Sequence, residues 1–390
     1  MMRILFLTST FEPLTGGAET YGLLLTSALA DIGHEVTIVT DGSWLPDLPL
    51  DTAERGCRVL RLRAFAEEVG RRDKVVWRQL QYALLNELGP LLDGERFDVV
   101  HANSHETLHL ALPIAESMGA ALVASLHEQN PDAEAFGVGR CRAAYAMLPV
   151  DMHIAASRFY EHRAKQYGTP EARLRRIYHG VDPEARVLGK AEARAQLGLP
   201  SDGLVVTCAG RIYTRKGQVH LARAFEQIRT RHPEAHLLLA GRVSDFAYAE
   251  EVFHLLERSY AAGAVTHQET LTFADMPEVF AATDVAVQPS LEEGLGLAAI
   301  EAMQHGVPVV ASDVIGLNEV IEDGVDGLLV PAEDPDALAA AVLRIADDPA
   351  LGASLAAAAR NTVATRFSVD VMRAATLAAY ETAVRNRLAR

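Results

Sequence analysis

The sequence predicts an α/β protein of two Rossmann-like domains, each built on a sheet of mainly parallel strands. Its 390 residues are more than one ordinary core holds and suggest two domains of about 150–200 residues each. Short aliphatic segments alternate with longer helical patterns, as they do in βαβ units. A stretch rich in Gly and Pro, near residues 182–200, separates two such series.

The first series contains seven short apolar segments that we interpret as strands. They lie at residues 4–9, 35–40, 58–62, 98–102, 122–126, 153–155 and 174–178. Helical patterns occupy residues 18–32 and 75–92, where apolar residues recur at helical spacing. The segment 43–52 is rich in Pro and Asp, and we expect an exposed loop there.

The second series repeats the alternation and then ends in helices. Its predicted strands are residues 203–209, 236–240, 285–289, 307–311 and 327–330. Three helical segments follow, at residues 335–346, 349–367 and 368–387. Because ligands of open parallel sheets bind where strands lead into helices, the loops after the strands are the places to search for a site.

Composition excludes several classes of function. Acidic residues outnumber basic ones by 52 to 36, a net charge of −16, so we expect no nucleic-acid partner. Three widely spaced cysteines form no metal-ligand cluster, which is typical of a reducing compartment. No apolar stretch approaches the roughly 18 residues of a membrane-spanning helix, and the first apolar segment is too short for a signal peptide. We therefore expect a cytoplasmic protein, and nothing in the sequence supports a peripheral membrane contact.

Two loops carry features of an anion site. Gly16-Gly17 lies between the first strand and the first helix, where backbone amides and the helix start can approach a phosphate, although paired glycines also occur in plain turns. The loop 210–217 follows the first strand of the second series and holds three cations, Arg211, Arg215 and Lys216. Such a cluster in an acidic protein favours a local phosphate site over a solvated turn.

A third loop, residues 289–301, is the most informative. A strand ends at Pro289, a Gly-x-Gly turn follows, and a helix is expected to start near Gly296. Glu293 lies in the loop and Glu301 on the helix, a spacing that suits two contacts along one elongated ligand. The segment 294–299 also matches the dinucleotide fingerprint G-x-G-x-x-A, but it does not follow the first strand of its domain, which argues against a nicotinamide enzyme.

These motifs resemble those of the family 4 retaining glycosyltransferases. In the second half, the matching segments are Gly210-Arg211…Lys216-Gly217, Glu293-Gly-Leu-Gly…Glu301, residues 306–313, Gly316…Glu319 and residues 323–331. In the first half they are Gly16-Gly17-Ala-Glu19, residues 33–36 and Gly180-Val181-Asp182. The resemblance implies the GT-B fold, in which two domains face each other across a cleft and the C-terminal helix crosses back to the first domain. We expect domains at residues 1–183, with a helix near 370–390, and at residues 184–369.

The resemblance also implies roles for individual residues. Arg211 and Lys216 would hold the donor diphosphate, Glu301 the ribose, and Glu293 the transferred sugar. His127 would contact that sugar from the first domain. The remaining donor-binding positions would be Gly16, Gly17, Gly210, Gly294, Leu295, Gly296 and Leu297. His179, Ile315 and Asn318 depart from the family pattern, which puts the preferred base and sugar in doubt.

The predicted activity is transfer of a sugar from a nucleoside diphosphate sugar, UDP- or GDP-linked, to a small molecule or glycan, with retention at the anomeric carbon. We find no Asp-x-Asp motif of the kind that metal-dependent sugar transferases use, so we expect neither a metal nor a cofactor. A sugar-nucleotide isomerase or epimerase on the same architecture, and a non-catalytic nucleotide-sugar binder, remain as alternatives. First-domain loops, including residues 103–107 and 128–139, are where we expect the acceptor.

Overall fold

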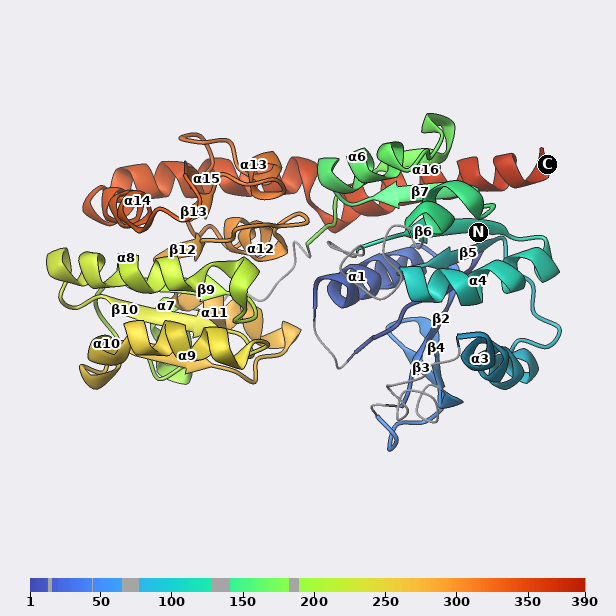
Figure 1. The fold of residues 1–390 in the computed structure, drawn as a ribbon, viewed down its shortest axis with the longest axis horizontal. Coiled ribbons are helices and arrows are strands. Elements are labelled where there is room, and N and C mark those ends of the chain that lie inside the picture. Colours follow the sequence, from blue (N-terminus) through green and yellow to red (C-terminus); the bar gives the residue numbers. More distant parts are fainter. Residues whose placement is uncertain (13–15, 44, 65–76, 128–140, 182–188, 390) are drawn as a thin grey trace. The chain divides into compact units, whose positions relative to one another are not determined.

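A computed structural model describes residues 1–12, 16–43, 45–64, 77–127, 141–181 and 189–389. The chain divides into two compact units (Figure 1). Unit 1 comprises Met1–Gly180 and Val369–Arg390, and unit 2 comprises Val181–Ser368. Each unit is an α/β domain with its own sheet, so the predicted fold class is confirmed.

Unit 1 is built on an eight-stranded sheet in the order β3-β4-β2-β1-β5-β6-β7-β8. All neighbouring strands are parallel except β3, which pairs with β4 in the antiparallel sense. The strands are β1 (Arg3–Leu7), β2 (Glu35–Asp41), β3 (Asp51–Glu54), β4 (Cys57–Leu62), β5 (Val99–Ala102), β6 (Ala121–Ser125), β7 (Met152–Ala155) and β8 (Leu174–Arg176).

The middle of this sheet is buried on both faces. Ile4, Leu5, Phe6 and Leu7 of β1 are each fully buried, as expected for a parallel strand that helices cover on both sides. The helices of the unit are α1 (Gly17–Asp31), α3 (Trp77–Leu91), α4 (His105–Met118), α6 (Arg158–Gln166) and α16 (Val369–Leu388). The carboxyl ends of β1 and β5 therefore open onto the loops that precede α1 and α4.

The C-terminal helix α16 belongs to unit 1 although it follows unit 2 in the chain. It packs against α1, β6 and β7. Its Tyr380 is fully buried, and the phenol oxygen lies 2.6 Å from Nδ1 of His101 on β5. The predicted return of the last helix to the first domain is thus confirmed.

Unit 2 has a six-stranded parallel sheet in the order β11-β10-β9-β12-β13-β14. Its strands are β9 (Val205–Ala209), β10 (His236–Ala240), β11 (Val265–Gln268), β12 (Val285–Gln288), β13 (Val309–Ser312) and β14 (Leu328–Val330). Its helices are α7 (Lys190–Gln196), α8 (Gln218–Arg231), α9 (Phe246–Leu255), α10 (Glu257–Ala261), α11 (Met276–Ala282), α12 (Leu297–Gln304), α13 (Leu317–Val320), α14 (Pro335–Asp347) and α15 (Pro349–Arg366). Helices α8, α9 and α14 share one apolar core with the strands.

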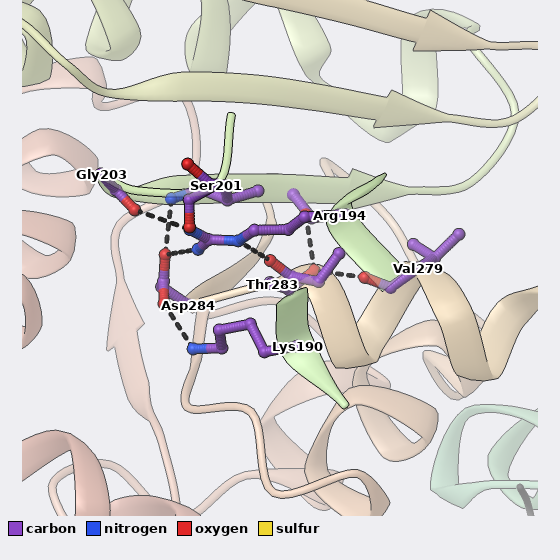
Figure 2. A network of polar contacts seen from close by, with 10 residues as sticks. Lys190, Arg194, Ser201, Gly203, Val279, Thr283 and Asp284 are labelled. Carbon is purple, nitrogen blue, oxygen red and sulfur yellow. Dashed lines mark hydrogen bonds and ion pairs between the residues drawn. The ribbon is translucent and has the colours of Figure 1, made fainter. Parts of the chain in front are cut away.

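A buried arginine fixes α7 to the amino-terminal edge of this sheet (Figure 2). The residue Arg194 is only 3% exposed, and its guanidinium donates to the carbonyls of Ala282 and Ser201, each at 3.1 Å, and to the Asp284 carboxylate at 2.6 Å. The same carboxylate accepts from the backbone N–H of Val205 at 2.7 Å. A buried charge is tolerated when several hydrogen-bond partners are in place. This network therefore stabilises unit 2 at the amino-terminal edge of its sheet, away from the loops that carry the site motifs.

Two strands were not predicted. Strand β3 lies partly in the segment 43–52, which we expected to be an exposed loop. It was not predicted because its four residues show no alternation of apolar and polar residues. It forms because Arg55 and Gly56, with φ of 49° and 76°, make the tight two-residue turn of a hairpin. Strand β11 lies at the edge of the unit 2 sheet, and only its first residue is buried. In the described part of the chain, no helix is both long and apolar enough to span a membrane.

Candidate active site

The motif loops of unit 2 meet at one point on its sheet. Strand β9 leads to the loop beginning at Gly210, and its neighbour β12 leads to the loop beginning at Pro289. The strand order reverses between β9 and β12, because the chain first adds β10 and β11 on one side and then returns to the other. In open α/β sheets this reversal is where ligands bind. The topology therefore brings the second and third motif loops together.

Glycines let these loops touch. Gly217 has φ of 66°, and a Cβ placed on it would lie 2.0 Å from the carbonyl oxygen of Pro289. The loops are also joined by a backbone hydrogen bond of 2.8 Å from the N–H of Leu291 to the carbonyl of Arg215. Gly316 has φ of 95°, and a Cβ placed on it would lie 2.6 Å from the carbonyl oxygen of Glu293. At these two positions, close backbone approach and a left-handed conformation both require glycine.

We predict that Gly217→Ala lowers the free energy of unfolding by about 2 kcal/mol or more, because it combines an unfavourable φ with a clash against backbone. Gly263→Ala is the matched control, since Gly263 also has a positive φ, of 67°, but a Cβ there would meet nothing within 4 Å. Urea unfolding would measure both variants. Equal losses in the two variants would mean that the loops do not need this close contact.

Lys216 and Glu293 form an ion pair at the meeting point. The Lys216 ammonium donates to Glu293 Oε1, which also accepts a 2.8 Å hydrogen bond from the Ser290 hydroxyl. The side chains are only 18% and 8% exposed. Burial alone would lower the pKa of Lys216, but the charge of Glu293 and its hydrogen bond outweigh this effect, and the pKa is raised. Lys216 is therefore a fixed cation.

The two arginines of the same loop lie differently. Arg211 is exposed, and its guanidinium carbon lies 5.1 Å from the centre of the Tyr213 ring. Arg215 lies 5.4 Å from the same ring and donates to the Tyr213 hydroxyl at 3.1 Å. A guanidinium held by a ring face keeps its donors available to an incoming anion. Arg211 therefore remains a candidate for phosphate contact, beside the more buried Lys216.

The helix start that follows Glu293 adds backbone donors. Helix α12 begins at Leu297, close to the predicted position, and its N-cap Gly296 offers no side chain to the first amides. Gly294 and Leu295 are buried, and Gly296, with φ of 94°, packs against Leu317. Unpaired N–H groups at a helix start carry a partial positive charge. This segment accordingly offers backbone hydrogen-bond donors next to the Lys216–Glu293 pair.

Glu301 lies one turn further along α12 and has an unusual environment. Burial raises the pKa of its carboxyl group to about 7, although the Lys216 charge partly offsets this effect. No described residue donates a hydrogen bond to that carboxyl group. A carboxylate in such a place gains stability when it accepts hydrogen bonds, which is the chemistry that ribose hydroxyl groups supply.

In unit 1, Gly16 and Gly17 lie where they were predicted, at the start of α1. Gly16 is the N-cap, without a side-chain hydrogen bond, and α1 begins at Gly17. Glu19, in the first turn, accepts from the Thr10 hydroxyl. Residues 13–15, which precede this motif, lie outside the described residues, as do Asp182 and the segment 128–139 where the acceptor is expected.

His127 follows β6 and is held in one tautomer. Its Nε2 lies 2.8 Å from Oδ1 of Asn103, whose amide nitrogen donates to the carbonyl of Ala18 at 3.2 Å. Because the Asn103 oxygen must accept, His127 Nε2 carries the proton. Burial lowers the pKa of His127 to about 4, so the ring is neutral near pH 7. Its Nδ1 is then a buried acceptor, and it has no partner among the described residues.

Two residues were missed as parts of the site: Ser290 supports Glu293, and Tyr213 supports both loop arginines. Asn103, from a loop predicted to lie near the acceptor, orients His127. Asn103 and Ser104 lie in a loop where the acceptor is expected; Asn103 is only 1% exposed, and Ser104 caps α4 by accepting from Thr107 N–H. One Asp-x-Asp pair, at Asp334 and Asp336, does occur. Asp334 caps α14, and Asp336 accepts from Gln227.

Comparison with known proteins identifies the family of the chain. Residues 189–362 match the family model described as glycosyl transferases group 1, and residues 15–185 match the model of glycosyltransferase family 4. The D-inositol 3-phosphate glycosyltransferase of Streptomyces avermitilis is 30% identical, over 95% of this chain and 83% of its own length. An uncharacterized glycosyltransferase of Methanocaldococcus jannaschii is 26% identical over nearly the whole of both chains, 98% and 99%.

Solved structures share the fold along the whole chain. Sucrose-phosphate synthase from Thermosynechococcus elongatus superposes with a TM-score of 0.82 and 26% identity, covering 98% of each chain. Anabaena HepE, solved with UDP and glucose, gives 0.78 at 24% identity, covering 97% of this chain and all of its own. With two family models spanning both units and a relative similar over most of its length, the chain belongs to the group 1 glycosyltransferases of family 4.

Proposed function

We propose that this glycosyltransferase moves a sugar from a nucleoside diphosphate sugar to a hydroxyl group of a small molecule or glycan, with retention and without a metal ion. The observation that carries the proposal is the Lys216–Glu293 pair at the strand reversal of unit 2. It places a fixed cation next to the loop that leads into α12, and both the cation and the start of the helix would stabilise an anionic leaving group.

Cleavage of the bond between the anomeric carbon and phosphate leaves negative charge on the diphosphate. Lys216, Arg211 and the start of α12 would stabilise that charge without reorganising during the reaction. Lys216 already pairs with the Glu293 carboxylate, and a bound diphosphate would be a second anion next to the Lys216 ammonium group. The Glu293 carboxylate could then also accept hydrogen bonds from hydroxyl groups of the sugar.

The names of two relatives support a small acceptor. The D-inositol 3-phosphate glycosyltransferase is named for a phosphorylated polyol, and the sucrose-phosphate synthase for a phosphorylated disaccharide. Both are similar to this chain over most of its length. We therefore place polyols and short sugars, rather than a polymer, first among acceptors to be tried.

The stereochemistry can be predicted from the site. Since the donor's own diphosphate would take the acceptor proton on the face that it leaves, no protein nucleophile is required, and the product keeps the donor's anomeric configuration. Proton NMR of the first product formed, before any equilibration, measures this configuration. An inverted product would contradict the mechanism and leave the fold assignment intact.

The reaction class and the metal requirement can be tested in the same assay. Release of nucleoside diphosphate that depends on the acceptor, and that continues in excess EDTA, is the expected result. Conversion of the nucleotide sugar without an acceptor would indicate an isomerase or epimerase instead. Loss of activity in EDTA, restored by a divalent cation, would contradict metal independence.

A further inference from the structure

Two buried glutamines bind the backbone on either side of Arg211. Gln218, the first residue of α8, is only 1% exposed, and its side-chain Nε2 donates to the Arg211 carbonyl at 2.9 Å. Gln288, the last residue of β12, is 2% exposed, and its Nε2 donates to the Ala209 carbonyl at 3.1 Å. Both contacts lie where β9 leads into the loop that carries Arg211 and Lys216. Side chains as well as the sheet therefore hold the backbone at this point.

The sheet alone holds the end of β9 only on one side. Strand β9 pairs with β10 as far as Ala209, and the Gly210 N–H then donates to the Ala240 carbonyl at 2.9 Å. The pairing of β9 with β12 ends earlier, at Thr207. A buried carbonyl that lacks a donor is unfavourable, and the Gln288 amide supplies the donor that the ladder with β12 no longer provides.

The peptide groups before and after Arg211 are both fixed. The one that follows donates through the Ile212 N–H to the Arg242 carbonyl at 2.9 Å, and its own carbonyl accepts from Gln218. The one that precedes packs against Gly241, where a Cβ would lie 2.3 Å from the carbonyl oxygen of that peptide. Because both peptide groups are held, the bond from Cα to Cβ of Arg211 has a fixed direction. The exposed Arg211 side chain therefore starts from a rigid base.

The stability of the fold does not by itself account for an amide at position 218. The Gln218 Oε1 is buried and has no hydrogen-bond partner in the described part of the chain. An unpaired buried acceptor lowers stability, and an apolar side chain of similar shape would avoid this penalty. Such departures from the most stable choice are expected at functional sites. We therefore interpret the amide of Gln218 as serving through its Nε2 donor.

We propose that Gln218 and Gln288 are positioning residues that aim the Arg211 guanidinium at the donor diphosphate. This inference rests on the proposed function, in which Arg211 helps to stabilise the leaving group. In this role neither glutamine contacts a substrate, and both act through the backbone of Arg211. A displacement of about 1 Å in a group that acts on the reacting atoms can lower a rate about 100-fold, so the direction of this side chain matters.

The kinetic test combines Gln218→Met or Gln288→Met with Arg211→Ala. Methionine keeps the length and nearly the volume of glutamine but lacks the amide. In the wild-type background, each methionine variant should lower kcat/KM for the nucleotide sugar about 5- to 20-fold. In the Arg211→Ala background, the same change should lower it less than about twofold, because the side chain that the glutamines position is gone. Initial rates of the single and double variants measure this coupling.

Thr283→Val is the matched control. Thr283 is also buried, and its hydroxyl donates to the Val279 carbonyl at 2.7 Å, but it precedes β12 at the amino-terminal edge of the same sheet. Its loss should change kcat/KM less than about twofold in either background. The Tm of Gln218→Met should fall no further than that of Thr283→Val, since the change also removes the unpaired Oε1. Equal losses of kcat/KM for Gln218→Met in the two backgrounds, or no loss in either, would overturn the proposal.

A binding measurement separates this proposal from the proposed function. Calorimetric titration with UDP and with GDP repeats the same cycle without turnover. For the nucleotide that binds more tightly, Gln218→Met should weaken affinity about 3- to 10-fold in the wild-type background and less than about twofold in Arg211→Ala. This result, in an enzyme that consumes no nucleotide sugar, supports the role of the glutamines and contradicts the proposed function. Acceptor-dependent turnover that is equal in wild type and both methionine variants overturns the role of the glutamines and leaves the proposed function intact.

Discussion

Replacing Lys216 by alanine is expected to lower kcat/KM for the nucleotide sugar about 30- to 1,000-fold, equivalent to about 2–4 kcal/mol of transition-state stabilisation. The Lys216 side chain is only 18% exposed, so its charge acts in a site where water screens it weakly. Initial rates over a range of donor concentrations measure the effect. A loss confined to KM would mean that Lys216 holds the donor equally well before and during the reaction.

The Lys216 variant needs two controls. Removing the lysine leaves the Glu293 carboxylate buried without its cation, which destabilises the fold in addition to any catalytic effect. Glu293→Gln combined with Lys216→Ala removes that unpaired charge and should recover stability without recovering turnover. Arg223→Ala removes one positive charge from α8, where Arg223 pairs with Glu251 at 3.7 Å, and should retain wild-type rates. Near-normal turnover in Lys216→Ala would mean that the diphosphate binds elsewhere.

Glu301→Gln is expected to stabilise the free enzyme and to weaken donor binding. The folded-state pKa of Glu301 is raised to about 7, above the usual value of 4.5 for this carboxyl group, so ionised Glu301 costs folding stability. The cost begins as pH rises above the unfolded value and is complete above about pH 7. It reaches at most about 3 kcal/mol, at 1.36 kcal/mol per pKa unit. Glutamine carries no charge, so its advantage over glutamate should grow by about 2 kcal/mol between pH 5.5 and pH 8.

Urea unfolding of wild type and Glu301→Gln at the two pH values measures this difference. Glu250→Gln, which changes an exposed residue on α9, is the control and should show no such growth. Affinity for a nucleoside diphosphate should fall about tenfold or more in Glu301→Gln, because hydrogen bonds to a charged group contribute about 1.5–3 kcal/mol. A variant that binds as tightly as wild type would exclude Glu301 as the ribose ligand.

The fold could be predicted because most strands are buried on both faces. The segments that form β1, β9 and β12 are largely apolar, and the structure places strands there. Strands β3 and β11 escaped prediction because both lie at sheet edges, where exposed or half-buried residues leave no apolar pattern. The pairing of β3 depends on a hairpin turn, and the Arg-Gly sequence of that turn is a weaker signal than Asn-Gly.

The site could be predicted only in part. The loop motifs identify Lys216, Glu293 and Glu301 because each lies at a fixed spacing from glycines, but the sequence does not reveal that Lys216 and Glu293 pair. That contact depends on the strand order, which puts β9 beside β12 across a long sequence separation. The contact of Gln288 with Ala209 was missed for the same reason. The two residues lie 79 positions apart, and only the folded sheet brings them together.

The most direct test of the central claim is a crystal structure with the nucleoside diphosphate that raises the Tm most. We predict phosphate oxygens about 3 Å from the Lys216 ammonium and near the first amides of α12, with the ribose hydroxyl groups on the Glu301 carboxylate. A nucleotide whose phosphates lie away from the loops that follow β9 and β12 would contradict the claim that this cation binds the leaving group.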